Sequence, residues 1–146
     1  MNKELIEYLK YECEDAHAVE KQVRAIDDEE TLYAYMCNYN WDDGFEIPSI
    51  ALKNKCCKLA TALMIFYGAS GVEMLVEKDM MKGSSKWAKF VEELYNQIVQ
   101  NKYEPGIVGY TIPLSKVQKY KINKVITEKE RIFITDVEGI DARIIV

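Results

Sequence analysis

The sequence has few prolines and glycines and no long apolar run, so it has the composition of an ordinary globular protein. It holds three prolines and seven glycines among 146 residues, which excludes a collagen-like or low-complexity chain. No apolar run approaches the roughly 20 residues that a membrane span needs. The charged start at Met1 enters a helical pattern without the apolar core of a signal peptide. We therefore expect one soluble, cytoplasmic domain over residues 1–146.

Signatures of catalysis and cofactor binding are also missing. The chain has no GxxxxGK[ST] or GxGxxG phosphate loop and no GxSxG nucleophile elbow. Cys13 and His17 have the spacing that could begin a zinc site or a Cys–His nucleophile. However, there is no second histidine, no cysteine lies in a CxxC pair, and Cys13 belongs to an apolar stripe. We expect free thiols, no metal, no cofactor, no catalytic residue, and a protein that is not an enzyme.

Charge is distributed unevenly along the chain. The net charge is −5, which argues against affinity of the whole protein for nucleic acid or for an anionic membrane. Residues 1–81 hold 16 acidic and 8 basic side chains, whereas residues 82–131 hold 5 acidic and 10 basic ones. Such asymmetry is typical of solvated helix faces, and it also permits the acidic half to attract a basic protein partner.

Helical periodicity dominates the first two thirds of the chain. Apolar residues recur at intervals of three and four, Asp27-Asp28 offers a helix N-cap, and Ser85 can cap the clearest helix of all. The nearly all-apolar helix around Leu63 is expected at the centre of the fold. The segments expected to be helical are 3–25, 29–38, 48–53, 59–67, 72–76 and 85–101.

The pattern changes after Pro105-Gly106, where β-branched residues become frequent. Alternating or clustered segments at 107–112, 120–126, 131–137 and 142–146 predict strands, with 138–141 as a hairpin connection. The sequence thus predicts an α+β fold. Its mostly helical part, residues 1–103, has about five or six helices, and a small antiparallel β element occupies the β-rich residues 104–146.

Four lysines surround Tyr120 in that region: Lys116, Lys119, Lys121 and Lys124. Lysines and an aromatic ring could follow a phosphate backbone and stack on a base. Lysines at alternating strand positions also protect an exposed sheet edge, and we favour that interpretation. We therefore do not expect nucleic-acid or membrane binding.

The densest motif is YNWDDGFEIP at residues 39–48, followed by TALMIFY at 61–67. It resembles a family of small bacterial proteins classed as a domain of unknown function. The segments 110–116 and 134–140 look like later segments of the same family. The resemblance implies no catalytic residue. It implies a place in accessory loci, including polymorphic-toxin loci, where small acidic proteins serve as immunity factors.

Three carboxylates fall within this motif, and they allow three interpretations. Asp42 and Asp43 can bond the backbone of a turn in which Gly44 permits positive φ, and we favour this structural role. Together with Glu46 they could instead bind a divalent cation or act as acid and base. They could also form an interface with Trp41 as its anchor. The candidate partner-binding residues are Asp27, Asp28, Glu29, Glu30, Trp41, Asp42, Asp43 and Glu46.

These observations favour a non-catalytic protein-binding module over an enzyme. The most concrete hypothesis is an immunity protein whose acids at 12–15, 27–30 and 42–46 contact a basic toxin and occlude it. The alternatives are a small metal-dependent hydrolase using the carboxylates, and a helical adaptor that binds a cellular peptide.

Overall fold

The computed structural model describes residues 1–79 and 83–146, and throughout them the regular structure is helical. None of the helices in these ranges combines the length and apolar character needed to cross a membrane. The helices are α1 (Lys3–Glu7), the π-helix η1 (Tyr8–Glu12), α2 (Ala16–Ala25), α3 (Glu29–Cys37), the 3₁₀ turn η2 (Trp41–Asp43), α4 (Glu46–Lys53), α5 (Leu59–Gly68), α6 (Val72–Val76), α7 (Lys86–Val99), α8 (Lys116–Asn123) and the 3₁₀ helix η4 (Glu128–Ile134).

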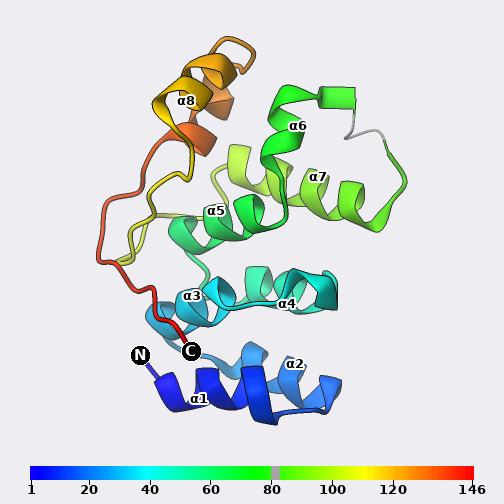
Figure 1. Cartoon of the computed structure of the whole chain (residues 1–146), viewed down its shortest axis with the longest axis vertical. Coiled ribbons are helices and arrows are strands. Elements are labelled where there is room, and N and C mark those ends of the chain that lie inside the picture. Colours follow the sequence, from blue (N-terminus) through cyan, green and yellow to red (C-terminus); the bar gives the residue numbers. More distant parts are fainter. Residues whose placement is uncertain (80–82) are drawn as a thin grey trace.

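The helices stack in layers along the long axis of the molecule (Figure 1). The first layer holds α1 and α2, the second holds α3 and α4, and the third holds α5 and α7. The contacts between layers form two rows of helices. In one row α1 packs on α3 and α3 packs on α5, and in the other α2 packs on α4. The stacking resembles that of a short α-solenoid, because each helix pair covers the apolar face of its neighbour.

Several helix starts lie where the sequence predicts them. The Asp28 carboxylate accepts a hydrogen bond from the amide of Thr31 at 2.9 Å, and the Ser85 hydroxyl accepts one from Ala88 at 3.0 Å. Each side chain satisfies an amide that the first helical turn leaves unpaired. The helices predicted from residues 29 and 85 are confirmed as α3 and α7.

The single helix predicted over 3–25 is wrong. The chain instead forms α1, widens into η1, and breaks around residues 13–15 before α2 begins. The amide of Cys13 donates to the carbonyl of Tyr8 at 2.9 Å, which closes the last π turn. Asp15 then takes an extended conformation and its carboxylate accepts from the amide of His17 at 3.0 Å, which starts a new helix.

The core lies on α3 and α5. All side chains from residue 59 to residue 66 are buried, as are those from 31 to 36. The prediction that the apolar segment 59–67 forms a central helix is therefore confirmed. Phe66 contacts the fully buried Phe133 with ring centroids 4.5 Å apart, so the core extends into the C-terminal region.

The α+β prediction is wrong, since the described residues contain no strand. Residues 116–123 form α8, and 128–134 form η4, where strands were expected. Each of these helices begins with a capping box, built by Ser115 with Gln118 and by Thr127 with Glu130. These reciprocal caps outweigh the β-branched composition.

Among the residues that the structure describes, pairing of extended chain is limited to two isolated bridges, Val108 with Ile140 and Tyr110 with Val137. Within the hairpin connection expected at 138–141, Ile140 instead pairs with residues 107–109, and Val137, just before it, pairs with Tyr110. Gly109 and Gly139 permit this approach, because a Cβ on either would lie within 2.7 Å of the other segment's backbone. Residues 142–146 run back along the stack without regular structure.

Candidate partner-binding site

The motif at residues 39–48 builds a compact turn from its own polar groups. The Asn40 side chain accepts a hydrogen bond from the amide of Asp42 at 3.1 Å. The Tyr39 hydroxyl donates to the carbonyl of Gly44 at 2.7 Å, where φ is +92°. Asn40 and Tyr39 therefore close the turn around Gly44, whose positive φ is as expected. The expected role of Asp42 and Asp43 is wrong, because neither of these described carboxylates accepts a hydrogen bond from the backbone of the turn.

Trp41 attaches this turn to the third layer. Its ring lies edge-on to Tyr39 at 5.2 Å and to Phe90 of α7 at 6.4 Å, while Phe45 stacks on Phe90 at 4.9 Å. A Cβ at Gly68 would lie 2.7 Å from the indole nitrogen, so the end of α5 fits closely against the ring. The structure therefore gives Trp41 packing contacts within the chain.

The exposed carboxylates of the turn face different surroundings. Asp42 is exposed and does not line the hollow between η1–α2 and α3–α4, whereas Asp43 and Glu46 do. This groove, which we call the acidic groove, has a volume of 510 Å³. Glu14 and Glu20 line its other wall, and Lys10 is the one basic residue among the described groove-lining residues.

The floor of the acidic groove is apolar and aromatic. Its apolar and aromatic members are Leu9, Tyr11, Ala16, Val19, Tyr35, Tyr39 and Ile47. Burial, and then the nearby Asp43, raise the pKa of Tyr35 to about 12. Burial, Asp43 and Glu46 also raise the pKa of Tyr39. Both phenols therefore stay neutral near pH 7, and the groove combines a neutral aromatic floor with acidic walls.

Such an arrangement fits a long cationic side chain. Lysine and arginine bury an apolar stem while the charged head remains solvated or paired. In the acidic groove the stem can lie on Tyr35 and Tyr39, and the head can reach Asp43 or Glu46. The site thus offers carboxylate acceptors to a cationic group.

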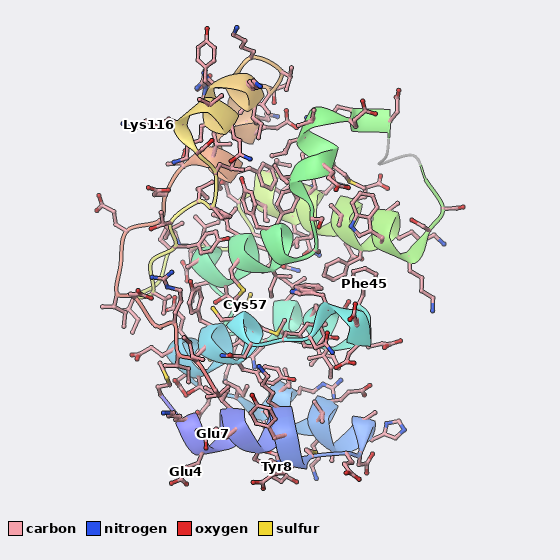
Figure 2. The ribbon with its side chains drawn as sticks, viewed as in Figure 1. Glu4, Glu7, Tyr8, Phe45, Cys57 and Lys116 are labelled. Carbon is pink, nitrogen blue, oxygen red and sulfur yellow. The ribbon has the colours of Figure 1, made fainter. Side chains whose placement is uncertain are left out.

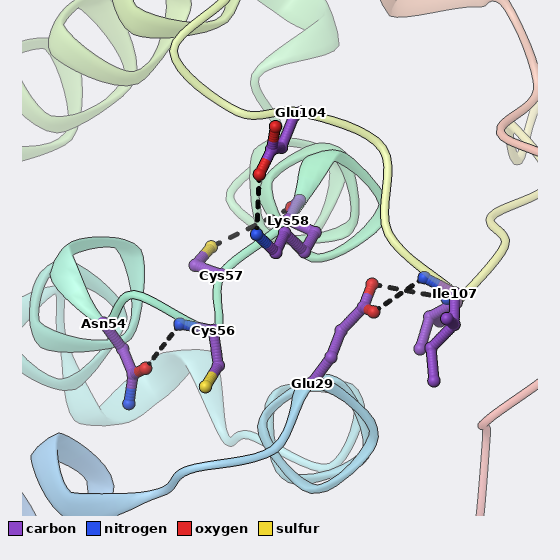
Figure 3. A network of polar contacts seen from close by, with 8 residues as sticks. Glu29, Asn54, Cys56, Cys57, Lys58, Glu104 and Ile107 are labelled. Carbon is purple, nitrogen blue, oxygen red and sulfur yellow. Dashed lines mark hydrogen bonds and ion pairs between the residues drawn. The ribbon is translucent and has the colours of Figure 1, made fainter.

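The acids at 27–30 lie at the other end of α3 and do not line the acidic groove. Asp28 caps α3 and lies 4.0 Å from the chain's α-amino group. The Glu29 carboxylate accepts from the amides of Ile107 and Val108 at 2.8 and 3.3 Å, which ties α3 to the C-terminal region (Figure 3). Asp27 is exposed and Glu30 is half-buried.

Cys13 and His17 do not share a helix, because the break at residues 13–15 separates them. His17 points into solvent with 94% of its side chain exposed. Burial raises the pKa of the Cys37 thiol to about 11 and that of Cys57 to about 12, so both are protonated near pH 7. Within residues 1–79 and 83–146, no three His, Cys, Asp or Glu side chains form a group that could hold a metal ion.

Sequence reasoning missed Glu20, Tyr35 and Tyr39 as parts of one surface. Helical periodicity places Glu20 on one helix and Tyr35 on the next, with Tyr39 just beyond it, but it does not show which layers stack. The sequence does show the acidic segments 12–15 and 42–46. The structure brings Glu14 of one segment and Asp43 of the other to the same groove.

Comparison with known proteins identifies one family. A model of a domain of unknown function, DUF4274, matches residues 27–99, which is half of the chain. The match covers the turn at 39–48 and α3 to α7. No curated protein and no solved structure matches. The chain therefore belongs to the DUF4274 family, whose function is unknown.

Proposed function

We propose that this protein is a non-catalytic protein-binding module whose acidic groove takes a basic segment of its partner. The observation that carries the proposal is the groove itself, in which Glu14, Glu20, Asp43 and Glu46 surround an aromatic floor with Lys10 as the one cation lining it in the described structure. Four carboxylates that line one groove give it a negative potential, which attracts a cationic partner.

The architecture supports this role. Stacked helix pairs present extended surfaces whose grooves lie between successive layers, and solenoid proteins use such surfaces to bind partners. The acidic groove lies between the first and second layers, with Glu20 on α2 and Glu46 on α4, and with Glu14 and Asp43 in the short segments that precede these two helices. A preorganised groove loses little conformational entropy when a partner binds.

The most specific form of the proposal is an immunity protein that neutralises a cognate bacterial toxin by occluding it. Its support is the family resemblance to proteins of toxin loci and the acidic character of residues 1–81. A basic toxin surface would be steered toward the groove, so association would be fast and sensitive to salt.

A comparison of three proteins tests the proposal. Tagged wild type, the groove variant Asp43→Lys/Glu46→Lys and the control Glu4→Lys/Glu7→Lys are used to capture partners from the organism's lysate and secreted fraction. Glu4 and Glu7 are exposed on α1, have the same spacing, and do not line the groove. We expect one stoichiometric basic protein with the wild type and the control, and its loss with the groove variant.

The captured protein is then purified and its association rate measured at rising ionic strength. We expect the rate to fall by about tenfold or more between low and high salt, as it does for electrostatically steered pairs. Equal capture by the groove variant, or a rate that salt leaves unchanged, contradicts the proposal. For the immunity form, the captured protein must also be toxic to cells and must lose that toxicity when the wild type is bound.

A further inference from the structure

The outward side of α8 carries apolar and basic groups together. Val117 and Tyr120 are each 63% exposed, and Val125, just beyond the helix, is 54% exposed. At 3.6 residues per turn, Val117, Tyr120 and Lys124 share the side of α8 opposite the buried Ile122. An exposed apolar strip of this kind on a short surface helix is typical of a surface with a partner.

Lysines flank this strip without acidic partners. Lys116, Lys121 and Lys124 are exposed, and none forms an ion pair with a carboxylate of residues 1–79 or 83–146. The Lys124 ammonium group lies 4.4 Å from the centre of the Tyr120 ring. These three charges are therefore available to an anionic surface.

A shallow hollow of 410 Å³ lies beside the strip, between α8 and η4. Lys116, Lys119 and Arg131 line it with Tyr120. Two of these cations have partners, since Lys119 lies 3.7 Å from Asp136 and Arg131 lies 2.8 Å from Glu128. The hollow still offers three cations to one small anionic group, which an isolated surface lysine cannot do.

The acidic residues at the far end of the molecule do not cancel the positive charge of the α8 surface. Lys116 lies at one end of the long axis, and Glu4 and Glu7 lie at the other (Figure 2). Charges much farther apart than about 8 Å are largely screened at physiological ionic strength. The net charge of −5 therefore describes the whole chain and not the surface that α8 presents.

We propose that α8 docks the protein on an anionic lipid surface. Lipid headgroups meet Lys116, Lys121 and Lys124, one headgroup occupies the hollow beside Arg131, and Val117 and Tyr120 enter the interfacial layer. Clustered lysines on a helix with exposed aromatic and aliphatic groups bind anionic bilayers in this way. The exposed valines favour lipid over nucleic acid, because a phosphate backbone offers aliphatic side chains no apolar surface.

Cosedimentation of the full chain with vesicles tests the inference. We expect binding to vesicles of phosphatidylcholine with phosphatidylserine, no binding to phosphatidylcholine alone, and release at high salt. Lys121→Glu/Lys124→Glu should weaken binding by about tenfold or more, since each lysine near such a surface contributes about 1 kcal/mol. The control Lys86→Glu/Lys89→Glu changes two exposed lysines of the same spacing on α7 and should bind as the wild type does.

Entry into the bilayer is measured separately with Tyr120→Trp. We expect its added emission to shift to the blue and to be quenched by brominated acyl chains, and we expect Val117→Ser to weaken binding while the lysines remain. No binding to the anionic vesicles overturns the inference. So does an equal loss in the Lys86/Lys89 control, or tighter binding to a single-stranded oligonucleotide that is lost in the Lys121/Lys124 variant.

Discussion

The helical stack and the C-terminal region differ in what determines their conformation. In the stack, residues 1–99, helices begin at local caps such as Asp28 and Ser85, and apolar stripes of neighbouring layers then cover one another. In residues 104–146 the buried apolar side chains are few. They are Val108, Ile112, Ile122, Phe133 and Ala142. The C-terminal region therefore depends on contacts with the stack for much of its conformation.

Polar side chains of the stack satisfy the backbone of the C-terminal region. The Tyr67 hydroxyl donates to the carbonyl of Phe133 at 2.7 Å, and the Asn38 amide donates to the carbonyl of Ile144 at 3.0 Å. The Glu29 carboxylate accepts from two amides at 107 and 108. Because these backbone groups lie in extended chain or at the end of η4, they lack partners in a sheet or helix, and side chains of the stack satisfy them instead.

The largest effect is expected where the two regions share a core. Phe133 is fully buried against Phe66 and stacks on Tyr95 with ring centroids 5.3 Å apart. Phe133→Ala should lower the free energy of unfolding by about 3–5 kcal/mol, measured by urea denaturation, through lost burial and a cavity. The exposed control Val125→Ala should change it little. A loss under about 1 kcal/mol in Phe133→Ala would show that the C-terminal region unfolds separately from the stack.

A smaller and pH-dependent effect is expected at Glu130, a buried carboxylate that also joins the two regions. It accepts hydrogen bonds from Lys78, from the Tyr95 hydroxyl at 2.6 Å and from the amide of Thr127 at 2.9 Å. Burial acts to raise the pKa of Glu130, but these hydrogen bonds outweigh it and lower the pKa below its ordinary value of 4.5. Its ionised form therefore stabilises the folded chain above about pH 4.5, and this contribution is lost as the pH falls through the lower folded pKa.

Glu130→Gln removes that charge and should lower the free energy of unfolding by about 2 kcal/mol at pH 7. The difference from the wild type should shrink as the pH falls below about 4.5. Glu128→Gln, an exposed neighbour on η4, serves as the control and should track the wild type at every pH. A difference that stays constant down to pH 3 would mean that Glu130 acts through packing alone.

Much of the stack could be predicted from the sequence because its signals are local. The caps at Asp28 and Ser85 and the apolar segment 59–67 each lie within one helix. The break at residues 13–15 was missed because Asp15 sits inside a continuous apolar stripe, and the stripe alone does not show that its side chain starts a new helix.

The C-terminal region was misassigned for a different physical reason. Its β-branched residues indicate strands, but the spacings of Ser115 with Gln118 and Thr127 with Glu130 are capping-box signals that the sequence also contains. The acidic groove could be predicted only in part, since Glu14 and Asp43 lie far apart in sequence and meet through the stacking of layers.

The smallest effect is expected when the same kind of N-cap is removed from a helix of each region. Ser85→Ala and Ser115→Ala each lose one N-cap, which costs about 1 kcal/mol locally. Because α7 buries Ala88, Val91 and Leu94 in the stack, losing its N-cap should lower the global free energy of unfolding by about 1 kcal/mol. In contrast, α8 buries only Ile122, so losing its N-cap should make α8 open locally more often and leave the rest of the chain folded. Amide exchange at 116–123 should then quicken about fivefold with little change in the urea midpoint, whereas equal global losses would show that α8 belongs to the same cooperative unit.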